Sequence, residues 1–414
     1  MTDLRRTIDA IWRIESAKLV AGLARMVRDV GLAEELAQDA LVAALEAWPA
    51  SGVPENPGAW LTATAKRRAI DVLRRHAMLA RKHQVMGAGE PDRVLPEVEA
   101  MLDDPIGDDR LRLLFISCHP VLSIEARVAL TLRLVGGLTT EEIARAFLAQ
   151  EPTIAQRIVR AKRALADAHV PFELPPAPEL AERLASVLEV LYLIFNEGYA
   201  ATAGDDWMRP ALCEEALRLG RIVAELAPSE PEVHGLVGLM EIQASRLGAR
   251  TGPSGEPVLL LDQDRGRWDR LLIQRGLAAL ERADRLGPGR GYYLLQGAIA
   301  ACHARAATAD ATDWKRIASL YAELVEVAPT PVVELNRAMA VAMADGAAAG
   351  LAIADALREV PELRRYHLLP SVRGDLLAKL GRREEARAEL ERAASLTKNA
   401  REREVLLARS RSLA

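Results

Sequence analysis

The chain has 414 residues, a formal net charge of −4, 50% hydrophobic residues and only 4% aromatic residues. This length predicts two to four domains, because a domain typically holds about 100–200 residues. The hydrophobic content excludes wholesale disorder, and a composition rich in Ala, Leu, Arg and Glu favours helices over strands. We therefore expect an all-α protein.

Cysteine usage and hydropathy indicate the compartment. The three cysteines lie far apart, so they predict no disulfide framework and no paired metal ligands. No apolar run reaches the roughly 18 residues of a membrane span, and no apolar segment typical of a signal peptide follows the charged N-terminus. We expect a cytoplasmic protein with no membrane contact, no metal and no cofactor.

Charged residues alternate in blocks along the first 170 residues. Residues 60–82 hold seven Lys and Arg against one acid, Asp71; residues 90–109 hold eight acids against Arg93; and residues 156–163 hold four bases and no acid. Basic blocks suit phosphates, whereas an acidic stretch is repelled by DNA. The pattern predicts two separate basic surfaces joined by an acidic linker.

In chain order, hydrophobic periodicity predicts helices over 4–30 and 32–48, a turn-rich loop over 49–58, and a third helix from Pro57 to about Arg75. In the second helix, one side should carry Leu36, Ala40, Leu41, Ala44, Leu45 and Trp48. An acidic linker follows over 81–109.

Four further helices are predicted over 110–117, 123–135, 141–147 and 152–168. Thr139 or Thr140 can cap the third of them, with Glu142 in its first turn, and Pro152 suits the start of the fourth. The segment 171–178 holds four prolines, which predicts a semi-rigid spacer and a domain boundary.

Helices alternate with short breaks in the second half of the chain. They are expected at about 179–200, 210–227, 231–249, 266–286, 291–307, 313–328, 331–343, 346–358, 362–380, 383–396 and 399–411. Segments 380–396 and 215–240 resemble the tetratricopeptide pattern, in which small residues let paired helices approach closely. The period is irregular, so no repeat number is predicted.

The segment 139–166 has the pattern of a helix-turn-helix. Ile154, Ile158, Ala161 and Leu165 recur at helical spacing and form a predicted buried stripe. The outward side chains are Thr153, Gln156, Arg157, Arg160 and Arg163. Arg and Gln can read guanine and adenine edges, and Thr can contact a phosphate or a thymine methyl. The alternative is a solvated amphipathic helix of a bundle.

The segment 60–75 is a second candidate nucleic-acid surface. Its apolar face is expected to hold Leu61, Ala65, Ile70 and Leu73, and its basic face holds Lys66, Arg67, Arg68, Arg74 and Arg75. Such a face suits a phosphate backbone, and Trp60 could stack on an unpaired base. The alternative places Trp60 in the core and leaves the charges to aid solubility.

In this order, residues 31–48, 60–75 and 110–166 resemble core-binding region 2, the −10-reading helix and region 4 of the extracytoplasmic-function (ECF) sigma factors of bacterial RNA polymerase. Arg67 stands where many members have Asn, which affects the expected −10 preference. Five short segments resemble the subgroup with a tetratricopeptide-like extension; they are 108–120, 195–199, 262–269, 312–314 and 332–338. In that subgroup the extension is thought to regulate activity.

This resemblance implies a domain order and a set of partners. Region 2 would span 1–80, the linker 81–109, region 4 110–170, the spacer 171–178 and a helical regulatory domain 179–414. Promoter DNA would be contacted at its −10 element from Trp60 onward and at its −35 element by 153–163. Region 4 would sit on the β-flap of core RNA polymerase, and region 2 would dock on the β′ clamp helices. The implied docking residues are Glu35, Gln38, Asp39, Leu41, Val42 and Leu45. An unidentified protein or ligand could bind the C-terminal domain.

Other motifs favour structural roles. Adjacent side chains diverge on a helix, so Cys118-His119 and Cys302-His303 do not suggest a metal site. The charged cluster at 262–269 is expected to be a solvated loop that caps the next helix, with a contact surface for region 2 or a small ligand as the alternative. Asn196 and Glu197 are expected in a buried polar network. No catalytic constellation converges, so we expect no enzyme.

Two functions remain open from the residues alone. The first is a sigma factor under cis control by its C-terminal half. The second is a helix-turn-helix regulator with a tetratricopeptide sensor domain that binds operator DNA without polymerase.

Overall fold

Helices make up the regular structure of the described part of the chain. The computed structural model describes residues 2–84, 107–147, 149–201, 207–253, 255–287 and 289–413. Within these ranges the regular elements are helices, and an isolated β-bridge pairs Thr251 with Pro257. The all-α prediction is therefore confirmed. Among the described helices, none combines the length and hydropathy that crossing a bilayer requires.

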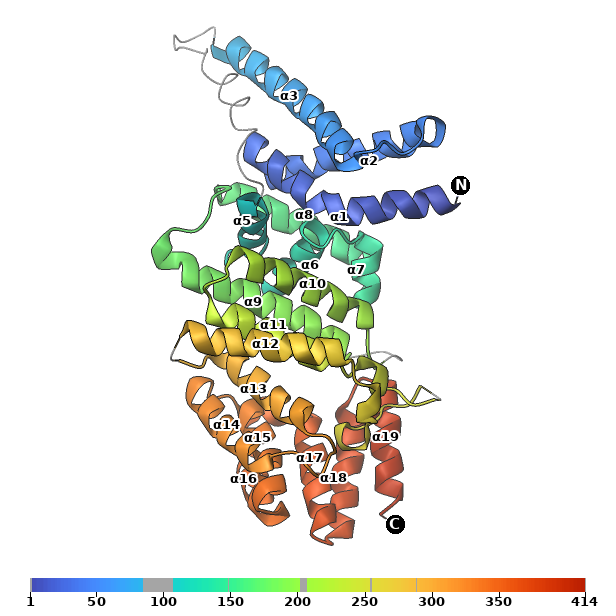
Figure 1. Cartoon of the computed structure of the whole chain (residues 1–414), viewed down its shortest axis with the longest axis vertical. Helices are drawn as coiled ribbons and strands as arrows, with labels where there is room; N and C mark the ends of the chain where they lie inside the picture. Colours follow the sequence, from blue (N-terminus) through green and yellow to red (C-terminus); the bar gives the residue numbers. More distant parts are fainter. Residues whose placement is uncertain are drawn as a thin grey trace. The chain divides into compact units, whose positions relative to one another are not determined.

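The chain divides into two compact units, Met1–Val190 (unit 1) and Leu191–Ala414 (unit 2). The helices of unit 1 are α1 (Thr2–Val27), α2 (Val30–Ser51), α3 (Pro57–Gln84), α5 (Gly107–Ser117), α6 (Ile124–Leu134), α7 (Thr140–Ala146) and α8 (Glu151–Asp167), shown in Figure 1. The following helix, α9 (Ala177–Tyr199), crosses from unit 1 into unit 2. The predicted boundary at the spacer stays a prediction.

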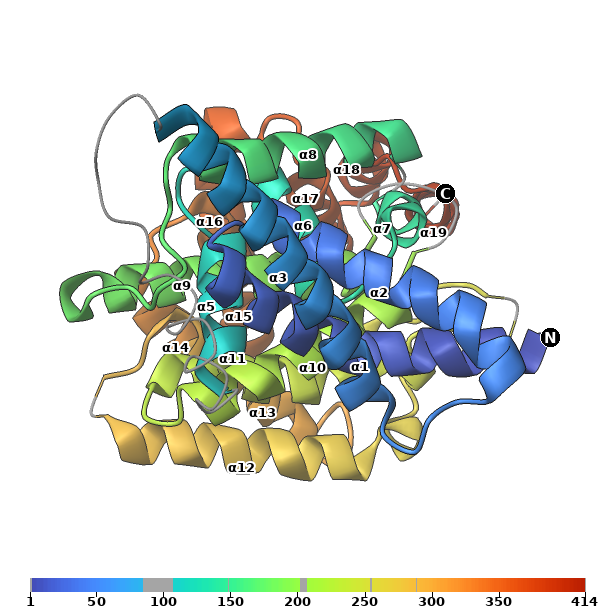
Figure 2. The same cartoon turned by 90° about the horizontal axis from the view of Figure 1, so that it is seen from above.

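Helices α1, α2 and α3 pack against one another, and both views show α3 lying beside α2 (Figures 1 and 2). Asp29 caps α2, because its carboxylate accepts a hydrogen bond from the backbone N–H of Leu32 at 2.9 Å. The buried side of α2 is mostly alanine, which allows close helix approach; its residues are Ala33, Glu34, Leu36, Ala37, Ala40, Ala44 and Trp48. Leu45 was predicted on this side, but it is 40% exposed.

Helices α2 and α3 both end later than predicted. Helix α2 continues through Pro49 to Ser51, and Gly52 then adopts a φ of +80°, which glycine tolerates best. Helix α3 continues past Arg75 to Gln84, because the sequence between them holds neither glycine nor proline. The predicted start of the linker at 81 is therefore helical, and 85–106 lies outside the described residues.

The buried stripe of α3 also shifts. Leu61, Ala65 and Ala69 are buried at i, i+4 and i+8, whereas Ile70 and Leu73 are only half-buried. A bulky residue next to a close helix contact is pushed to its edge, so the alanines occupy the contact itself.

The first half of α9 is hydrogen-bonded to the end of α5 and to the turn that follows it. Arg183 donates to the carbonyl of Phe115 at 2.9 Å, and Ser186 donates to the carbonyl of Cys118 at 2.8 Å. Arg127 of α6 donates to the Ser186 hydroxyl at 3.0 Å. Side chains beyond the proline-rich spacer therefore hold backbone groups of the predicted region 4.

Unit 2 is a succession of helices. They are α10 (Pro210–Leu226), α11 (Pro231–Ala244), α12 (Arg270–Leu286), α13 (Tyr292–Arg305), α14 (Trp314–Val327), α15 (Pro331–Asp345), α16 (Ala347–Ala356), α17 (Leu368–Lys379), α18 (Arg383–Leu396) and α19 (Ala400–Arg411). Short 3₁₀ turns lie at Leu247–Ala249, Leu260–Asp262, Arg265–Arg267 and Pro361–Leu363. From α13 onward each helix packs on its neighbour in sequence, which confirms the helical-repeat prediction.

Helices α11 and α12 cross at a pair of glycines. A Cβ atom on Gly276 would lie 2.9 Å from the backbone oxygen of Gly238 and 2.6 Å from Cγ1 of Ile242. A Cβ atom on Gly238 would lie 3.0 Å from the backbone oxygen of Gly276. No side chain fits at this crossing without moving the helices apart.

We therefore expect Gly276→Ala to destabilise the protein by about 1–3 kcal/mol, because overpacking outweighs the gain in helix propensity. The matched control is Gly22→Ala in α1, where a Cβ would meet no heavy atom within 4 Å. That control should be neutral or stabilising by about 1 kcal/mol. Denaturant unfolding of the full chain measures both, and a stabilised Gly276→Ala protein would contradict the close crossing.

The cluster at 262–269 is exposed at Asp262, Asp264, Arg267 and Asp269, as a solvated loop would be, but the prediction is wrong for Arg265 and Trp268, which are buried. Trp268 is 3% exposed and Arg265 is 8% exposed. The guanidinium of Arg265 donates to the carbonyls of His303 and Ala306 and to the hydroxyl of Thr312, and it lies 4.7 Å from the Trp268 ring centroid. Asp269 does cap α12, as predicted. The partners of Arg265 follow it by some forty residues, which local sequence does not reveal.

His303 lies beside Arg265 and is 8% exposed. Burial, together with the nearby charges of Arg246 and Arg265, lowers the pKa of His303 to about 4 from 6.5. In the unfolded chain the imidazole of His303 is protonated near pH 6.5, whereas in the folded protein it stays neutral down to about pH 4. Unfolding should therefore become easier as the pH falls through this window, by about 3 kcal/mol in total.

The variant His303→Gln should lack this part of the pH dependence. Urea unfolding of both proteins between pH 7.5 and pH 4.5 measures it, and the difference between them isolates His303 from other titrating groups. Identical pH dependence in the two proteins would contradict a neutral, buried His303.

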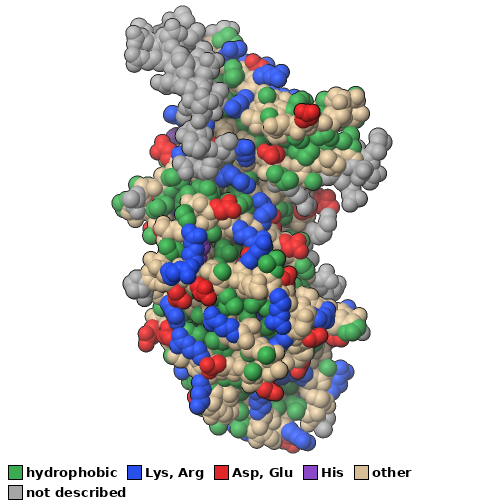
Figure 3. Space-filling model, in the orientation of Figure 1, with side chains coloured by type: hydrophobic (Ala, Val, Ile, Leu, Met, Phe, Trp, Pro, Cys, Tyr) green, Lys and Arg blue, Asp and Glu red, His purple; other side chains and the backbone are tan. Residues whose placement is uncertain are grey.

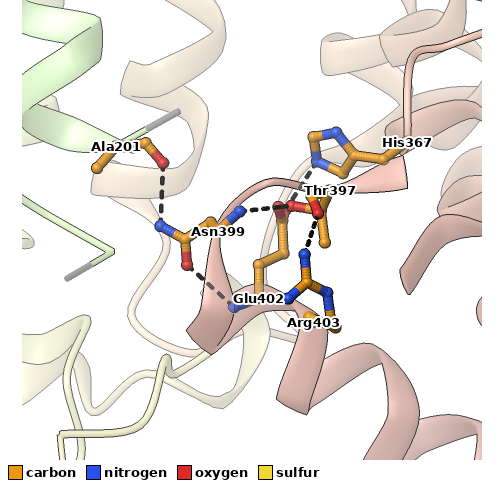
Figure 4. Close-up of polar contacts among 6 residues, drawn as sticks. All are labelled: Ala201, His367, Thr397, Asn399, Glu402 and Arg403. Carbon is orange, nitrogen blue, oxygen red and sulfur yellow. Dashed lines mark hydrogen bonds and ion pairs between the residues drawn. The ribbon is translucent and has the colours of Figure 1, made fainter. Parts of the chain in front are cut away.

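The last helix of unit 2 is joined to the chain that follows α9. Asn399 caps α19 and donates through Nδ2 to the carbonyl of Ala201 at 3.2 Å (Figure 4). Glu402 lies between His367, at 2.9 Å, and the Thr397 hydroxyl. Burial alone would raise the pKa of Glu402, but these two partners lower it. The network fixes the end of the repeat array to its beginning.

Candidate nucleic-acid interface

Helices α7 and α8 form the predicted helix-turn-helix. Thr139 and Glu142 make a reciprocal capping box: the Thr139 N–H donates to Glu142 at 2.8 Å, and the Glu142 N–H donates to the Thr139 hydroxyl at 3.1 Å. Ile154, Ile158, Ala161 and Leu165 are all buried in α8, so the predicted stripe is confirmed. This stripe fixes which side of α8 faces outward.

The outward side of α8 borders a shallow groove of about 370 Å³. Thr153, Gln156, Arg157 and Arg160 line its α8 side, and the turn before α6, with Val121 and Ser123, lines the other. Arg157 is half-buried and the other three are exposed. Neither Arg157 nor Arg160 has a carboxylate at ion-pair distance within the described residues, which leaves both guanidinium groups available to bases or phosphates.

Arg163 differs from the other predicted residues of α8. It lies outside the groove, its side chain is 82% exposed, and it approaches Asp167 at 3.6 Å. The structure therefore brings together four of the five predicted residues. It adds Val121 and Ser123, which the sequence pattern did not single out because they lie in a turn about thirty residues earlier.

Helix α3 presents the second basic surface. Arg67, Arg74 and Arg75 are exposed, and Lys66 and Arg68 are half-buried. On the face drawn in Figure 3, basic and acidic side chains are intermixed over most of the surface. The concentration of basic side chains is therefore a local feature of α3.

Trp60 combines the two predicted alternatives. Its ring is half-buried and meets the edge of Trp48, with 5.4 Å between the ring centroids and an interplanar angle of 66°. Trp48 is 1% exposed, so it anchors the pair in the core. One part of Trp60 is therefore fixed by packing, and the other part stays accessible.

The exposed side of α2 carries an apolar pair among polar residues. Val42 is 50% exposed and Leu45 is 40% exposed. Glu35 and Asp39 are exposed beside them, and Gln38 and Leu41 are half-buried. Asp39 lies 3.3 Å from Arg68 of α3, so one ion pair joins the predicted docking residues to the predicted DNA residues. Exposed pairs of this kind contribute at most about 1 kcal/mol.

One residue that the sequence pattern missed is Glu34 of α2, whose side chain is 5% exposed. Its carboxylate accepts a hydrogen bond from Arg133 of α6 at 2.6 Å and contacts Lys162 of α8. Gln38 donates to the same carboxylate at 2.6 Å. Burial alone would raise the pKa of Glu34, but Lys162 and Arg133 lower it, so the carboxylate is ionised at neutral pH.

Asp109 also lies in a different environment from the one predicted. It was predicted to lie in the acidic linker, but it is 3% exposed at the start of α5. Its carboxylate lies 3.5 Å from Arg25 of α1 and also pairs with Arg112. A buried carboxylate needs such partners, because an unpaired buried charge is very costly.

The cysteine–histidine pairs show no ligand geometry. The thiol of Cys118 lies 3.3 Å from the Thr131 hydroxyl, and burial raises its pKa to about 12. In the ranges that the structure describes, no three His, Cys, Asp or Glu side chains gather in a way that could hold a metal ion.

Comparison with known proteins identifies three parts of the chain. The sigma-70 region 2 model matches residues 14–78, and the sigma-70 region 4 model matches 112–165. A family of unknown function (DUF6596) matches residues 183–284. The first match runs from the middle of α1 into α3, the second includes most of the helix-turn-helix, and the third begins inside α9. Regions 2 and 4 on one chain define a sigma factor.

Curated relatives include one that matches nearly the whole chain and sigma factors that match its first part. An uncharacterised protein of Rhizobium meliloti (strain 1021) is 43% identical over 391 residues, covering 92% of this chain and 90% of that protein. The probable ECF RNA polymerase sigma factor SigI of Mycobacterium tuberculosis (strain CDC 1551 / Oshkosh) is 28% identical, over 41% of this chain and 58% of its own. The ECF sigma factor SigK of Mycobacterium ulcerans (strain Agy99) is 30% identical, over 34% and 75%.

The chain belongs to the ECF sigma factors and carries a long C-terminal helical extension.

Proposed function

We propose that the protein directs core RNA polymerase to promoters and that its C-terminal extension controls this activity in cis. The observation that carries the first part is the α8 groove: a buried apolar stripe turns Thr153, Gln156, Arg157 and Arg160 toward one side. Arg and Gln in this arrangement suit bidentate contacts to bases in the major groove.

The proposed contacts follow the order of the two regions. The groove residues, with Arg163 at their edge, would contact the −35 element. The basic face of α3 and the accessible part of Trp60 would hold the −10 strand, since aromatic rings stack on unpaired bases. The exposed side of α2 would dock on the β′ clamp helices, and region 4 on the β-flap. The protein itself would make and break no bonds, and it would act in the cytoplasm with its polymerase partner.

In vitro transcription tests the first part of the proposal. The full chain with core polymerase should initiate at a cognate promoter, and start-site mapping should then give the −10 and −35 sequences. Failure to bind core polymerase would overturn it. A tight footprint on duplex DNA without polymerase would instead support the helix-turn-helix regulator.

Control in cis is supported by α9. Its first half donates two hydrogen bonds to carbonyls of region 4, through Arg183 and Ser186. Its second half is part of unit 2. A ligand or partner that changes unit 2 would therefore act on a helix already fastened to the −35-binding region.

Variants in the full chain test this control without deleting the extension. Arg183→Ala and Ser186→Ala should each change transcription from the cognate promoter at least about fivefold, and in the same direction. A fivefold change is at the lower end of typical coupling between two sites. The control is Glu182→Gln, an exposed residue of the same helix. Transcription equal to wild type in both variants, with folding intact, would contradict coupling through α9.

A further inference from the structure

The seam between regions 2 and 4 inside unit 1 contains an ion triad that no motif predicted. Glu34 comes from α2 of region 2, whereas Arg133 and Lys162 come from α6 and α8 of region 4. The Glu34 side chain is 5% exposed, and those of Arg133 and Lys162 are 20% exposed. Charges removed from water to this extent interact far more strongly than surface pairs.

A second ion pair crosses the seam where α1 packs against α5. The carboxylate of Asp109, at the start of α5, pairs with Arg25 of α1. Beside these pairs lies a cavity of about 780 Å³, lined by Arg25, Arg28, Lys162 and the segment after α8. This part of the seam, where Lys162 lies, is therefore not closely packed.

This contact is incompatible with the simultaneous binding of two promoter elements. Elements centred at −10 and −35 are separated by about 25 base pairs, or roughly 85 Å of B-DNA at 3.4 Å per base pair. In this structure α2 and α8 touch through the triad, and Arg133 Nε lies 2.6 Å from Glu34. Helix α8 must leave α2 before region 2 and region 4 can each reach their own element.

A direct link connects the triad to the proposed polymerase-docking residues. Gln38 is one of them, and its side-chain amide donates to Oε1 of Glu34 at 2.6 Å. A polymerase group that binds Gln38 would remove this hydrogen bond from the carboxylate. Docking of α2 on polymerase is then coupled to release of region 4, because Gln38 and Glu34 lie one helix turn apart.

We propose that the Glu34–Arg133–Lys162 triad is a latch that holds the polymerase-free protein closed, and that docking of α2 on core polymerase opens it. This proposal rests on the sigma-factor function proposed above. It assigns to Glu34 a regulatory role in promoter binding, separate from the residues that contact DNA.

A reversible cross-link provides the sharpest test. A Cβ atom on Gly31 would lie 4.0 Å from Cβ of Lys162, inside the range of about 3.5–4.5 Å that disulfides require. The double variant Gly31→Cys, Lys162→Cys should therefore close when oxidised. With core polymerase, we expect the oxidised protein to form at least about tenfold less open complex than the reduced protein, with activity restored by reductant.

The single variant Gly31→Cys, treated identically, controls for oxidation of the native cysteines. Equal open-complex formation by the oxidised and reduced double variant, with the cross-link verified by mass spectrometry, would overturn the latch. Failure of the wild-type protein to support transcription under any condition would instead overturn the proposed function, so the two failures are distinguishable.

A second variant tests the triad itself. Glu34→Gln keeps the shape of the side chain but removes its charge, and should increase the radius of gyration of the free protein in small-angle scattering. Glu46→Gln, an exposed residue of the same helix, should leave it unchanged. A folded Glu34→Gln protein as compact as wild type would show that the triad does not hold the closed form.

Discussion

Replacing Leu45 with aspartate should weaken the affinity for core polymerase by roughly 30- to 1000-fold, a loss of about 2–4 kcal/mol that is typical of a central interface residue. Leu45 is 40% exposed and Val42, one helix turn away, is 50% exposed. An exposed apolar pair on a helix suits burial against a partner, and a new carboxylate there would be buried without a counter-charge. Because Leu45 is already exposed, the fold itself should tolerate the change.

The measurement is a binding titration of the full chain with core polymerase. Ile14→Asp is the matched control, since Ile14 is 68% exposed on α1, outside the proposed docking residues. Loss of binding in Leu45→Asp but not in Ile14→Asp would support docking through α2. Equal binding by both variants would show that core polymerase docks on a surface other than α2.

Replacing Arg157 or Arg160 with alanine should weaken the free energy of binding to the −35 element by about 1–3 kcal/mol in each case. It should also relax the sequence preference at one position. Both side chains line the α8 groove, and neither has a carboxylate at ion-pair distance in the described residues. Their loss would remove a base contact without freeing a buried partner. Competition binding of the holoenzyme to promoter variants measures both effects.

Arg163→Ala provides the contrast. Its side chain lies outside the groove and is 82% exposed, so we expect a smaller loss that is uniform across sequences and lowers the salt dependence. An unchanged −35 preference in Arg157→Ala and Arg160→Ala would show that they contact phosphates and that other groove residues read the bases.

Local patterns predicted the parts of the fold that depend on local spacing. The stripe Ile154, Ile158, Ala161 and Leu165 follows from helical periodicity, and all four residues are buried. The Thr139–Glu142 capping box depends on a spacing of three residues, and it forms as expected. Both features belong to the helix-turn-helix, which is why its geometry could be anticipated.

Features that depend on distant partners could not be anticipated. Glu34 resembles any other acid on an alanine-rich helix until Arg133, 99 residues away, is placed beside it. Arg265 and Trp268 resemble a charged loop until α13 supplies carbonyl acceptors. In both cases tertiary contacts set the environment of a charged residue, and hydrophobic periodicity does not predict such contacts.

The continuity of α9 limits how this protein can be dissected. A cut at the proline-rich spacer would remove the side chains of Arg183 and Ser186 along with the extension, and would leave the carbonyls of Phe115 and Cys118 without those donors. A truncated chain could then lose activity through damage to the region proposed to bind the −35 element, with no regulator involved. By the same reasoning, gene fusions that exchange such extensions between sigma factors should retain function only when the junction falls beyond the first half of this helix.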